Sequence, residues 1–123
     1  MVRLTFCLRR LPHLSREQFQ HYWLETHGPL VRELAGTLRI RRYVQLHTVT
    51  TPLNEALRRG RGGPEEYDGV AELSWDSLEA LAAATSSPEG RQAGRRLLED
   101  ERRFIDLAHS PLWLAQEHMI VSE

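Results

Sequence analysis

The chain has 123 residues, of which 41% are hydrophobic and 27% charged, and its formal net charge at pH 7 is −1. That length predicts one domain over residues 1–123, and the balanced charge argues against a role in binding nucleic acid or an acidic membrane surface. Because the chain has no apolar run long enough to span a bilayer, no secretory leader pattern and a single cysteine, we expect a cytoplasmic protein without an internal disulfide.

The first predicted element is a strand over residues 2–10. Hydrophobic and polar side chains alternate along it, which is typical of a strand with one buried face. Pro12 follows the strand and ends it, because proline cannot donate a hydrogen bond to a sheet. The hydrophobic side chains that share one face of this strand are Val2, Leu4, Phe6 and Leu8.

A helix is predicted over residues 15–34, and its start is well specified. Ser15 and Gln18 have the spacing of a capping box, in which each side chain accepts a hydrogen bond from the backbone of the other. Hydrophobic side chains then recur every three or four residues, which directs one face of the helix at a core. The aromatic members of that face are Phe19, Tyr22 and Trp23.

His27 lies at the edge of this buried face, four residues after Trp23. Because proline disfavours helical backbone in the residue before it, we expect the helix to break at Gly28 and to restart at Pro29. The break would place His27 at a helix end, where the free carbonyls favour an imidazolium ion and burial favours the neutral ring. The direction of any change in the pKa of His27 therefore stays open at this point.

The second strand is predicted over residues 39–49, and its two faces differ in chemistry. Val44 and Leu46 lie on one face. The other face is polar, which is unusual for a strand that meets a core. Its side chains are Tyr43, Gln45 and His47.

A long loop is predicted over residues 50–67, with one helical turn at residues 53–58. A mobile lid and a simple surface excursion both fit a loop of this length, and we favour the excursion. A third strand follows over residues 68–75 and carries the ionisable Glu72 near its centre.

The last third of the chain predicts a helix and then a strand. Asp76 and Glu79 have helix-opening spacing, and Pro88 is suited to the first turn of the helix that continues after it. A buried stripe is expected to include Ala93 and Phe104, whereas the arginines and acids between them are interpreted as a solvated face. The final strand is predicted over residues 112–121.

The resulting order, β-α-β-β-α-β, predicts an α+β, ferredoxin-like fold with an antiparallel sheet and both helices on one face. The uncovered face would then need another partner, so we expect a homodimer joined sheet to sheet. The apolar side chains expected on the uncovered face are Val2, Leu4, Phe6, Leu8, Val44, Leu46, Leu73 and Trp75.

Several segments of the sequence resemble the EthD family in the family's order. The first is the pattern F-x-x-Y-W-x-x-x-H-G-P-L-V, and the later ones are YDGVAELSWDSLEAL, SSPEG and RFIDLAHSPLWLAQE. The resemblance spans nearly the whole chain and implies a dimeric α+β barrel, with a cavity between the helices and the sheet of each protomer. It also implies that His27 matches the histidine that transfers protons in related isomerases.

His27 is accordingly the candidate catalytic residue, with a structural histidine as the alternative. If the polar face of strand two meets the helices, Tyr43, Gln45 and His47 would face His27 across an apolar pocket suited to an oxygenated aromatic compound or a lactone. If that face is the dimer interface, these three side chains are interfacial polar groups. We favour the pocket, because the strictly apolar set is better suited to a contact between sheets.

The remaining candidate binding residues are one acid and four aromatic side chains. Glu72 could act as a base or form an ion pair with His47 or an arginine. Tyr22, Trp23, Phe104 and Trp113 could form walls of a substrate pocket or simply belong to the core. No histidine or cysteine spacing typical of a metal site and no glycine-rich nucleotide loop is present, so we expect neither metal nor cofactor.

The sequence therefore favours a small cofactor-independent enzyme in which His27 transfers a proton on a hydrophobic oxygenated substrate of aromatic, polyketide-like or lactone type. Isomerisation, cyclisation, decarboxylation and oxygenation are all compatible with that role. The alternative is a non-catalytic homodimer that binds a small ligand or assists an oxygenase. Haem binding, which occurs among dimeric α+β barrels, is a third possibility.

Overall fold

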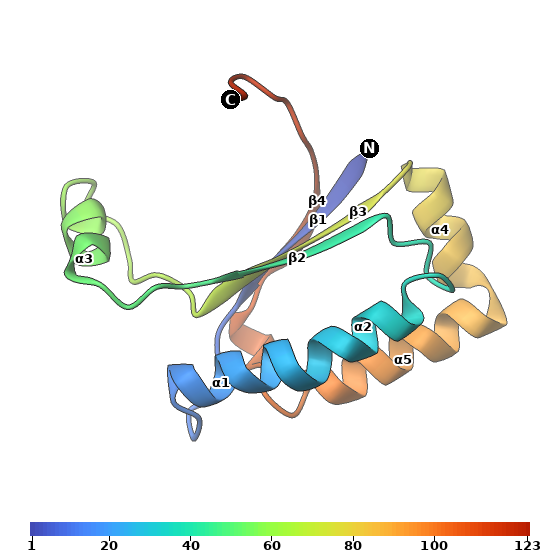
Figure 1. Cartoon of the computed structure of the whole chain (residues 1–123), viewed down its shortest axis with the longest axis horizontal. Coiled ribbons are helices and arrows are strands. Elements are labelled where there is room, and N and C mark those ends of the chain that lie inside the picture. The colour runs from blue at the N-terminus through green and yellow to red at the C-terminus, as the bar shows by residue number, and fades with distance from the viewer.

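Four antiparallel strands form one sheet in the order β2-β3-β1-β4, and the helices α1, α2, α4 and α5 lie along one of its faces (Figure 1). A computed structural model describes all residues, 1–123. The strands are β1 (Val2–Leu8), β2 (Arg42–His47), β3 (Gly69–Trp75) and β4 (Leu112–Gln116). The α-helices are α1 (Arg16–Tyr22), α2 (Gly28–Leu34), α3 (Pro52–Arg59), α4 (Leu78–Ser86) and α5 (Pro88–Glu101).

This arrangement is the predicted ferredoxin-like α+β fold. Helix α3, at the site of the predicted helical turn, projects with its loops beyond one end of the sheet (Figure 1). The final strand is shorter than predicted and ends at Gln116, after which the chain is exposed and has no regular secondary structure. No helix of the protein combines the length and apolar composition that crossing a membrane requires.

The predicted start of the first helix is confirmed. The Ser15 hydroxyl accepts a hydrogen bond from the Gln18 amide at 3.0 Å, and the Gln18 side chain accepts one from the Ser15 amide at 2.9 Å. These two bonds satisfy backbone donors that the first helical turn leaves free.

The predicted break at Gly28 is wrong, because the helix runs on through a π-helical turn at Trp23–His27 into α2. The Gly28 amide donates to the Trp23 carbonyl, five residues back, instead of four. This wider turn accommodates Pro29, which has no N–H and whose ring would crowd the carbonyl of a regular α-helical turn. A π-helical turn holds one residue more than an α-helical turn, so the side chains in it are rotated about the helix axis. His27 is therefore buried and Thr26 is exposed.

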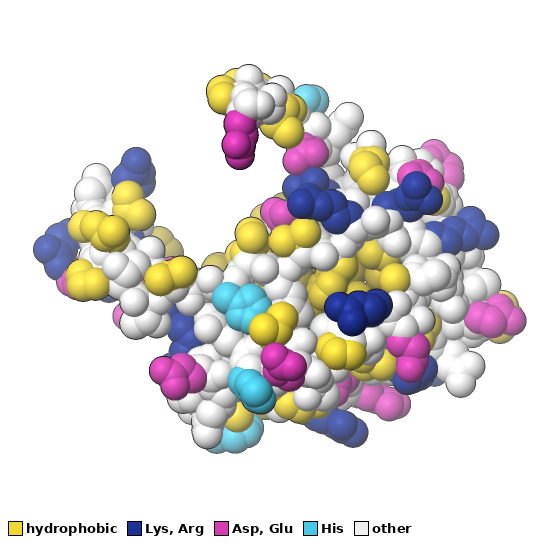
Figure 2. Space-filling view, viewed as in Figure 1, with side chains coloured by type: hydrophobic (Ala, Val, Ile, Leu, Met, Phe, Trp, Pro, Cys, Tyr) yellow, Lys and Arg dark blue, Asp and Glu magenta, His cyan; other side chains and the backbone are white.

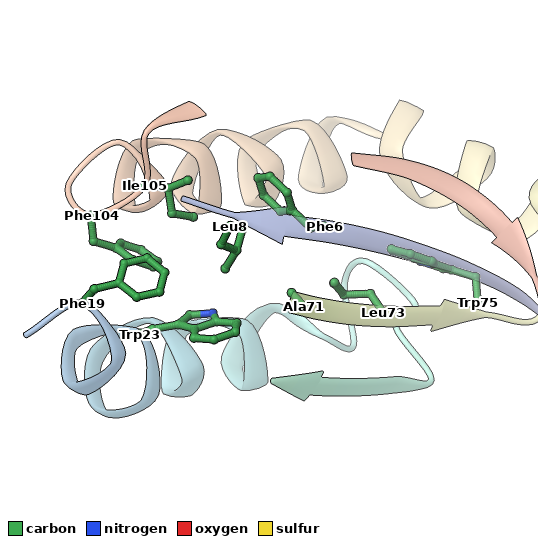
Figure 3. Close-up of a cluster of buried hydrophobic side chains, with 9 residues drawn as sticks. All are labelled: Phe6, Leu8, Phe19, Trp23, Ala71, Leu73, Trp75, Phe104 and Ile105. Atoms are coloured by element: carbon green, nitrogen blue, oxygen red, sulfur yellow. The ribbon is translucent and has the colours of Figure 1, made fainter. Parts of the chain in front are cut away.

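The main core lies between the sheet and the helices (Figure 3). Aromatic side chains of the helical layer pack together, with ring centroids of Phe19 and Phe104 5.5 Å apart. The sheet contributes the alternating hydrophobic side chains of its two central strands to the same core. The nine buried members of this core are Phe6, Leu8, Phe19, Trp23, Ala71, Leu73, Trp75, Phe104 and Ile105.

The apolar faces of β1 and β3 therefore meet the helices, and the expectation that they form the uncovered face is wrong. Strand register explains the difference, since Leu73 is opposite both Leu4 and Tyr43, and residues opposite each other share a face. Helices bury this apolar face, and the polar face of β2 continues it at the sheet edge. Of the predicted uncovered set, only Val44 and Leu46 lie on the other face.

A buried carboxylate anchors the start of the first helix to the sheet. Asp68, fully buried just before β3, accepts hydrogen bonds from the Arg10 guanidinium at 2.7 Å and from Arg16 Nε at 3.0 Å. Burial alone would raise the pKa of Asp68, but the hydrogen bonds from Arg10 and Arg16 outweigh it and lower that pKa. The ionised carboxylate therefore fixes the helix that carries His27.

Candidate functional site

A partly open, largely apolar cavity of about 230 Å³ lies between the helical layer and the sheet. Its walls come from both layers, with Trp23 and Val31 on the helical side and Phe6 and Leu73 on the sheet side. Four polar side chains interrupt the apolar wall, and one of them, Thr85, donates its hydroxyl to a carbonyl of its own helix. The other three offer polar groups to the cavity. They are His27 from the π-helical turn, Tyr43 from β2 and Glu101 from the end of α5.

His27 is buried, and its two ring nitrogens have different surroundings. Nδ1 lies 2.7 Å from an oxygen of Asp100, which is also buried. Nε2 makes no hydrogen bond within the chain, and it is not sealed away as a buried unpaired atom. The carboxylate therefore holds the tautomer with hydrogen on Nδ1 and leaves the Nε2 lone pair available in the cavity.

Burial lowers the pKa of His27, and the hydrogen bond and charge of Asp100 oppose this effect without cancelling it. The neutral imidazole is consequently the form favoured at pH 7. A neutral ring with a free Nε2 can accept a proton from a bound molecule.

Asp100 organises the surroundings of His27, although its position within the charged run of α5 suggested a solvated residue. It also accepts a hydrogen bond from the Tyr22 hydroxyl at 2.5 Å. The ring of Phe104 lies 5.1 Å from both the Tyr22 and the His27 ring centroids. Tyr22 and Phe104, predicted as pocket walls, therefore support His27 from behind and do not line the cavity itself.

Glu101, the last residue of α5, was also expected on the solvated face but lines the cavity. Its carboxylate makes no hydrogen bond and no ion pair within the chain. Burial, reinforced by the neighbouring charge of Asp100, raises the pKa of Glu101 to about 7.

The polar side chains of β2 form one connected hydrogen-bond network. The Gln45 amide group donates to the Trp23 carbonyl at 2.9 Å and to the Tyr43 hydroxyl at 2.8 Å. The Gln45 carbonyl lies 2.7 Å from Nε2 of His47, whose ring stacks on Trp23 with centroids 4.5 Å apart. This network ties the edge strand to the π-helical turn.

Tyr43 belongs to the wall that the cavity and this network share, and its hydroxyl can still donate a hydrogen bond. Its oxygen accepts from Gln45, which leaves its own O–H free to donate. Burial raises the pKa of the Tyr43 phenol to about 12, so the phenol stays protonated at neutral pH. A neutral donor in an apolar wall suits a carbonyl or phenolic oxygen of a ligand.

A wider groove lies outside the cavity, between α2 and the edge strand β2. It shares Val31, Ile40 and Tyr43 with the cavity wall, so the two spaces adjoin at these residues. Gln45 and His47 line this groove and not the cavity. Figure 2 shows hydrophobic side chains in a hollow bordered by charged ones on this face of the molecule.

Two predicted site residues, Glu72 and Trp113, lie on the opposite face of the sheet. The register places both opposite Thr5, on the face that no helix covers. Glu72 forms an ion pair with Arg3 at 3.4 Å, which is the alternative that the sequence left open for it. The sheet therefore separates these two residues from His27.

The predicted residues thus divide into four groups, with His27, Trp23 and Tyr43 at the cavity. No group of three or more histidine, cysteine, aspartate or glutamate side chains is arranged to hold a metal ion. Sequence reasoning missed Asp100 and Glu101, and the only available signal was their place just before the buried Phe104.

An antiparallel four-stranded sheet with helices on one face and a cavity between the two layers defines a ferredoxin-like α+β protein. Comparison with known families makes the assignment specific. The EthD domain matches residues 11–108, and the chain belongs to the EthD family.

Solved structures share this fold at low sequence identity. An EthD family protein from Bacillus halodurans is 22% identical, with a TM-score of 0.62 and coverage of 96% of this chain and 100% of that one. A dimeric protein of unknown function from Bacteroides fragilis is 10% identical, with a TM-score of 0.58 and coverage of 94% and 95%. SnoaB, a cofactor-independent oxygenase from Streptomyces nogalater, is 13% identical, with a TM-score of 0.53 and coverage of 99% and 97%.

Proposed function

We propose that this protein is a cofactor-independent enzyme in which His27 moves a proton on a hydrophobic, oxygen-bearing substrate held in the cavity. The observation that carries the proposal is the pairing of His27 Nδ1 with buried Asp100, which leaves Nε2 free beside an apolar space. Asp100 acts as a positioning residue, because it holds the imidazole and does not face the substrate.

The first chemical step in this proposal is removal of a proton from an acidic carbon of the substrate by neutral His27. The negative charge that develops moves to a substrate oxygen, where the Tyr43 hydroxyl donates a hydrogen bond. A donor fixed in an apolar site stabilises such charge more strongly than water does, because its dipole is already oriented. Proton transfer to or from a carbon next to a carbonyl is a step in isomerisation, cyclisation, decarboxylation and some oxygenations.

The substrate class follows from the cavity walls and size. An apolar space of about 230 Å³ suits a ring compound of one or two fused rings, and its few polar groups suit one or two oxygen atoms. The fold shared with SnoaB, a cofactor-independent oxygenase, supports chemistry without a cofactor.

The test is deuterium exchange into 2-tetralone, a bicyclic ketone with an acidic C–H between its carbonyl and its aromatic ring. Purified protein in D₂O is expected to accelerate loss of the C1 proton signal in ¹H NMR above the buffer rate. His27→Gln should remove the acceleration, because the amide cannot accept the proton, by about 10²–10⁴-fold. His13→Gln, at an exposed histidine, is the matched control. Equal exchange rates for wild type and His27→Gln would contradict the proposal.

A non-catalytic ligand-binding role gives a different result in the same experiment. In that case 2-tetralone binds, as measured by its effect on the protein spectrum, but neither wild type nor His27→Gln changes the exchange rate. The cavity alone favours this alternative, and the free Nε2 of His27 favours catalysis.

We also propose that two copies of the chain join through the face of the sheet that lacks helices. Hydrophobic side chains stand on that face without a partner, and Leu46 and Trp113 are 48% and 49% exposed. Burial of these groups against a second copy would remove them from water. The Bacteroides fragilis protein, which is dimeric and has a ferredoxin-like fold, supports a dimeric state.

A further inference from the structure

We propose that Glu101 is a second catalytic residue of the same cavity, which donates a proton to a substrate oxygen while His27 removes one from carbon. This inference rests on the proposed function of His27. It makes the enzyme a two-residue acid and base catalyst.

The placement of Glu101 distinguishes it from the other acids of α5. Glu99 is exposed, and Asp100 is held by His27 and Tyr22. Glu101 lines the apolar cavity with His27 and Tyr43, and neither of its carboxylate oxygens has a partner within the chain. Neither oxygen is a buried unpaired atom, so both remain accessible.

Nothing in the fold uses this carboxyl group for stability. An unpaired carboxylate in apolar surroundings is costly, and the negative end of the helix dipole at the C-terminus of α5 adds to the cost. A leucine or glutamine would fit the same wall without the penalty. Such locally unfavourable groups are characteristic of functional sites.

The same surroundings suit the group for proton donation. Burial and the charge of Asp100 raise the pKa of Glu101 to about 7, so a large fraction carries a proton near neutral pH. Burial lowers the pKa of His27, so the imidazole is neutral over the same range. Two groups with these opposite shifts form an acid and base pair.

The step balances for a ketone such as 2-tetralone. The C1–H bond breaks and its proton joins His27 Nε2, while the C–H electron pair forms the C1–C2 double bond. The carbonyl π pair moves to oxygen, which takes the proton of Glu101. The products are the enol, an imidazolium ion and a carboxylate, and the reverse steps with solvent deuterium regenerate the ketone and both residues.

The experiment measures the pH dependence of 2-tetralone exchange for wild type, Glu101→Gln and Glu101→Asp, with Glu99→Gln as the control for charge. Wild type and Glu99→Gln should lose activity as pH rises through about 7, where Glu101 loses its proton. Glu101→Gln should be slower by about 10²–10⁴-fold and should lack this alkaline decline. Glu101→Asp, which keeps a carboxyl group, should retain part of the rate.

The pKa of Glu101 is also measured directly, by NMR titration of each variant. The same spectra show whether the variant is folded. In ¹³C-carboxyl NMR, one glutamate signal should titrate near pH 7 and be absent in Glu101→Gln. Exchange by Glu101→Gln at the wild-type rate, or no glutamate titrating near pH 7, would overturn the role of Glu101 and leave that of His27 intact. No exchange by wild type at any pH would overturn the function of His27 and this inference with it.

Discussion

Asp100 determines which nitrogen of His27 is available and how readily that nitrogen takes a proton. A buried aspartate that accepts hydrogen bonds from both an imidazole and a phenol holds these two side chains in place. The chemistry of the cavity thus depends on one residue that does not line it.

We predict that Asp100→Asn lowers the pKa of His27 further, because the carboxylate is the group that opposes the effect of burial. Histidine ¹⁵N NMR titration measures this change directly. The substitution should also cost about 1–3 kcal/mol of unfolding free energy, since a buried phenol and imidazole lose a charged acceptor. Asp106→Asn, which removes the carboxylate beside exposed His109, is the control. An unchanged His27 titration would show that Asp100 does not set its charge.

Glu101 should make stability depend on pH in a way that a glutamine does not. Its pKa is about 7 in the folded protein and 4.5 as the reference value, so the folded state binds more protons between these pH values. The resulting stabilisation is complete below pH 4.5 and is lost as pH rises through 7. The free energy of unfolding of Glu101→Gln, measured in urea, should therefore rise relative to that of wild type when the pH is raised from 5 to 8. The expected rise is about 1–3 kcal/mol. An equal difference at both pH values would contradict this prediction.

Among single residues, the sequence pointed to His27 and Tyr43, which both line the cavity, but not to Asp100 and Glu101. His27 was found because its spacing from Trp23 placed it near a buried face. Asp100 and Glu101 belong to the run Glu99-Asp100-Glu101, where composition alone predicts solvent exposure. Which of three adjacent acids turns inward depends on how α5 packs, and that is a tertiary property.

The π-helical turn is the element that places His27 and Trp23 together. His27 points inward from this turn, and the Trp23 carbonyl accepts a hydrogen bond from the Gln45 side chain of β2. On its other side, the Trp23 ring packs directly on Gly69 of β3, where an added Cβ would overlap the ring. Trp23 therefore contacts two strands, β2 through its carbonyl and β3 through its ring, and it also lines the cavity.

Gly69→Ala tests this packing. The new methyl group would push the Trp23 ring from its position, so we expect a loss of about 1–3 kcal/mol in unfolding free energy and a changed stack on His47. Urea unfolding gives the energy, and near-ultraviolet circular dichroism reports the ring. Gly36→Ala, where no atom lies within 4 Å of the added Cβ, is the control. Equal stability of the two variants would contradict the packing argument.

Local sequence signals predicted most elements, because capping and alternation are short-range effects. The capping box of Ser15 and the proline at the start of α5 are both as predicted. The helix break at Gly28 was wrong, because a proline rule based on regular helices does not include a π-helical turn. Contacts with Gln45 from a distant strand help to hold that turn, and they are not visible in local spacing.

For the whole molecule, the two faces of the sheet have different surroundings. The helix-covered face holds the core and the cavity. The other face carries a mixture of ion pairs and exposed hydrophobic side chains, including Arg3 paired with both Glu72 and Glu117. Such a mixed surface resembles an interface more than a core.

Leu46→Asp should convert the proposed dimer to monomer at micromolar concentration, because a charge would have to be buried between the two sheets. Sedimentation velocity measures the change in mass. Leu98→Asp, at an exposed position on α5, is the control and should leave the mass unchanged. A wild-type protein that sediments as a monomer, or a Leu46→Asp variant that stays dimeric, would contradict the interface.

Topology was the most predictable property, since the order of elements and right-handed crossovers admit few arrangements. The assignment of faces was only half right. The polar side chains of β2 face the helices as favoured, yet the apolar faces of β1 and β3 do so too. The alternation of hydrophobic and polar residues shows which side chains share a face within one strand. Only the register between strands shows which of these faces lie on the same side of the sheet.

The most direct test of the account is the rate of deuterium exchange into 2-tetralone at pH 7, compared between wild type and His27→Gln. Wild type should accelerate the exchange, and His27→Gln should be slower by about 10²–10⁴-fold while it keeps the fold and the affinity for 2-tetralone. Exchange at the same rate in both proteins would contradict the central role of the His27 imidazole.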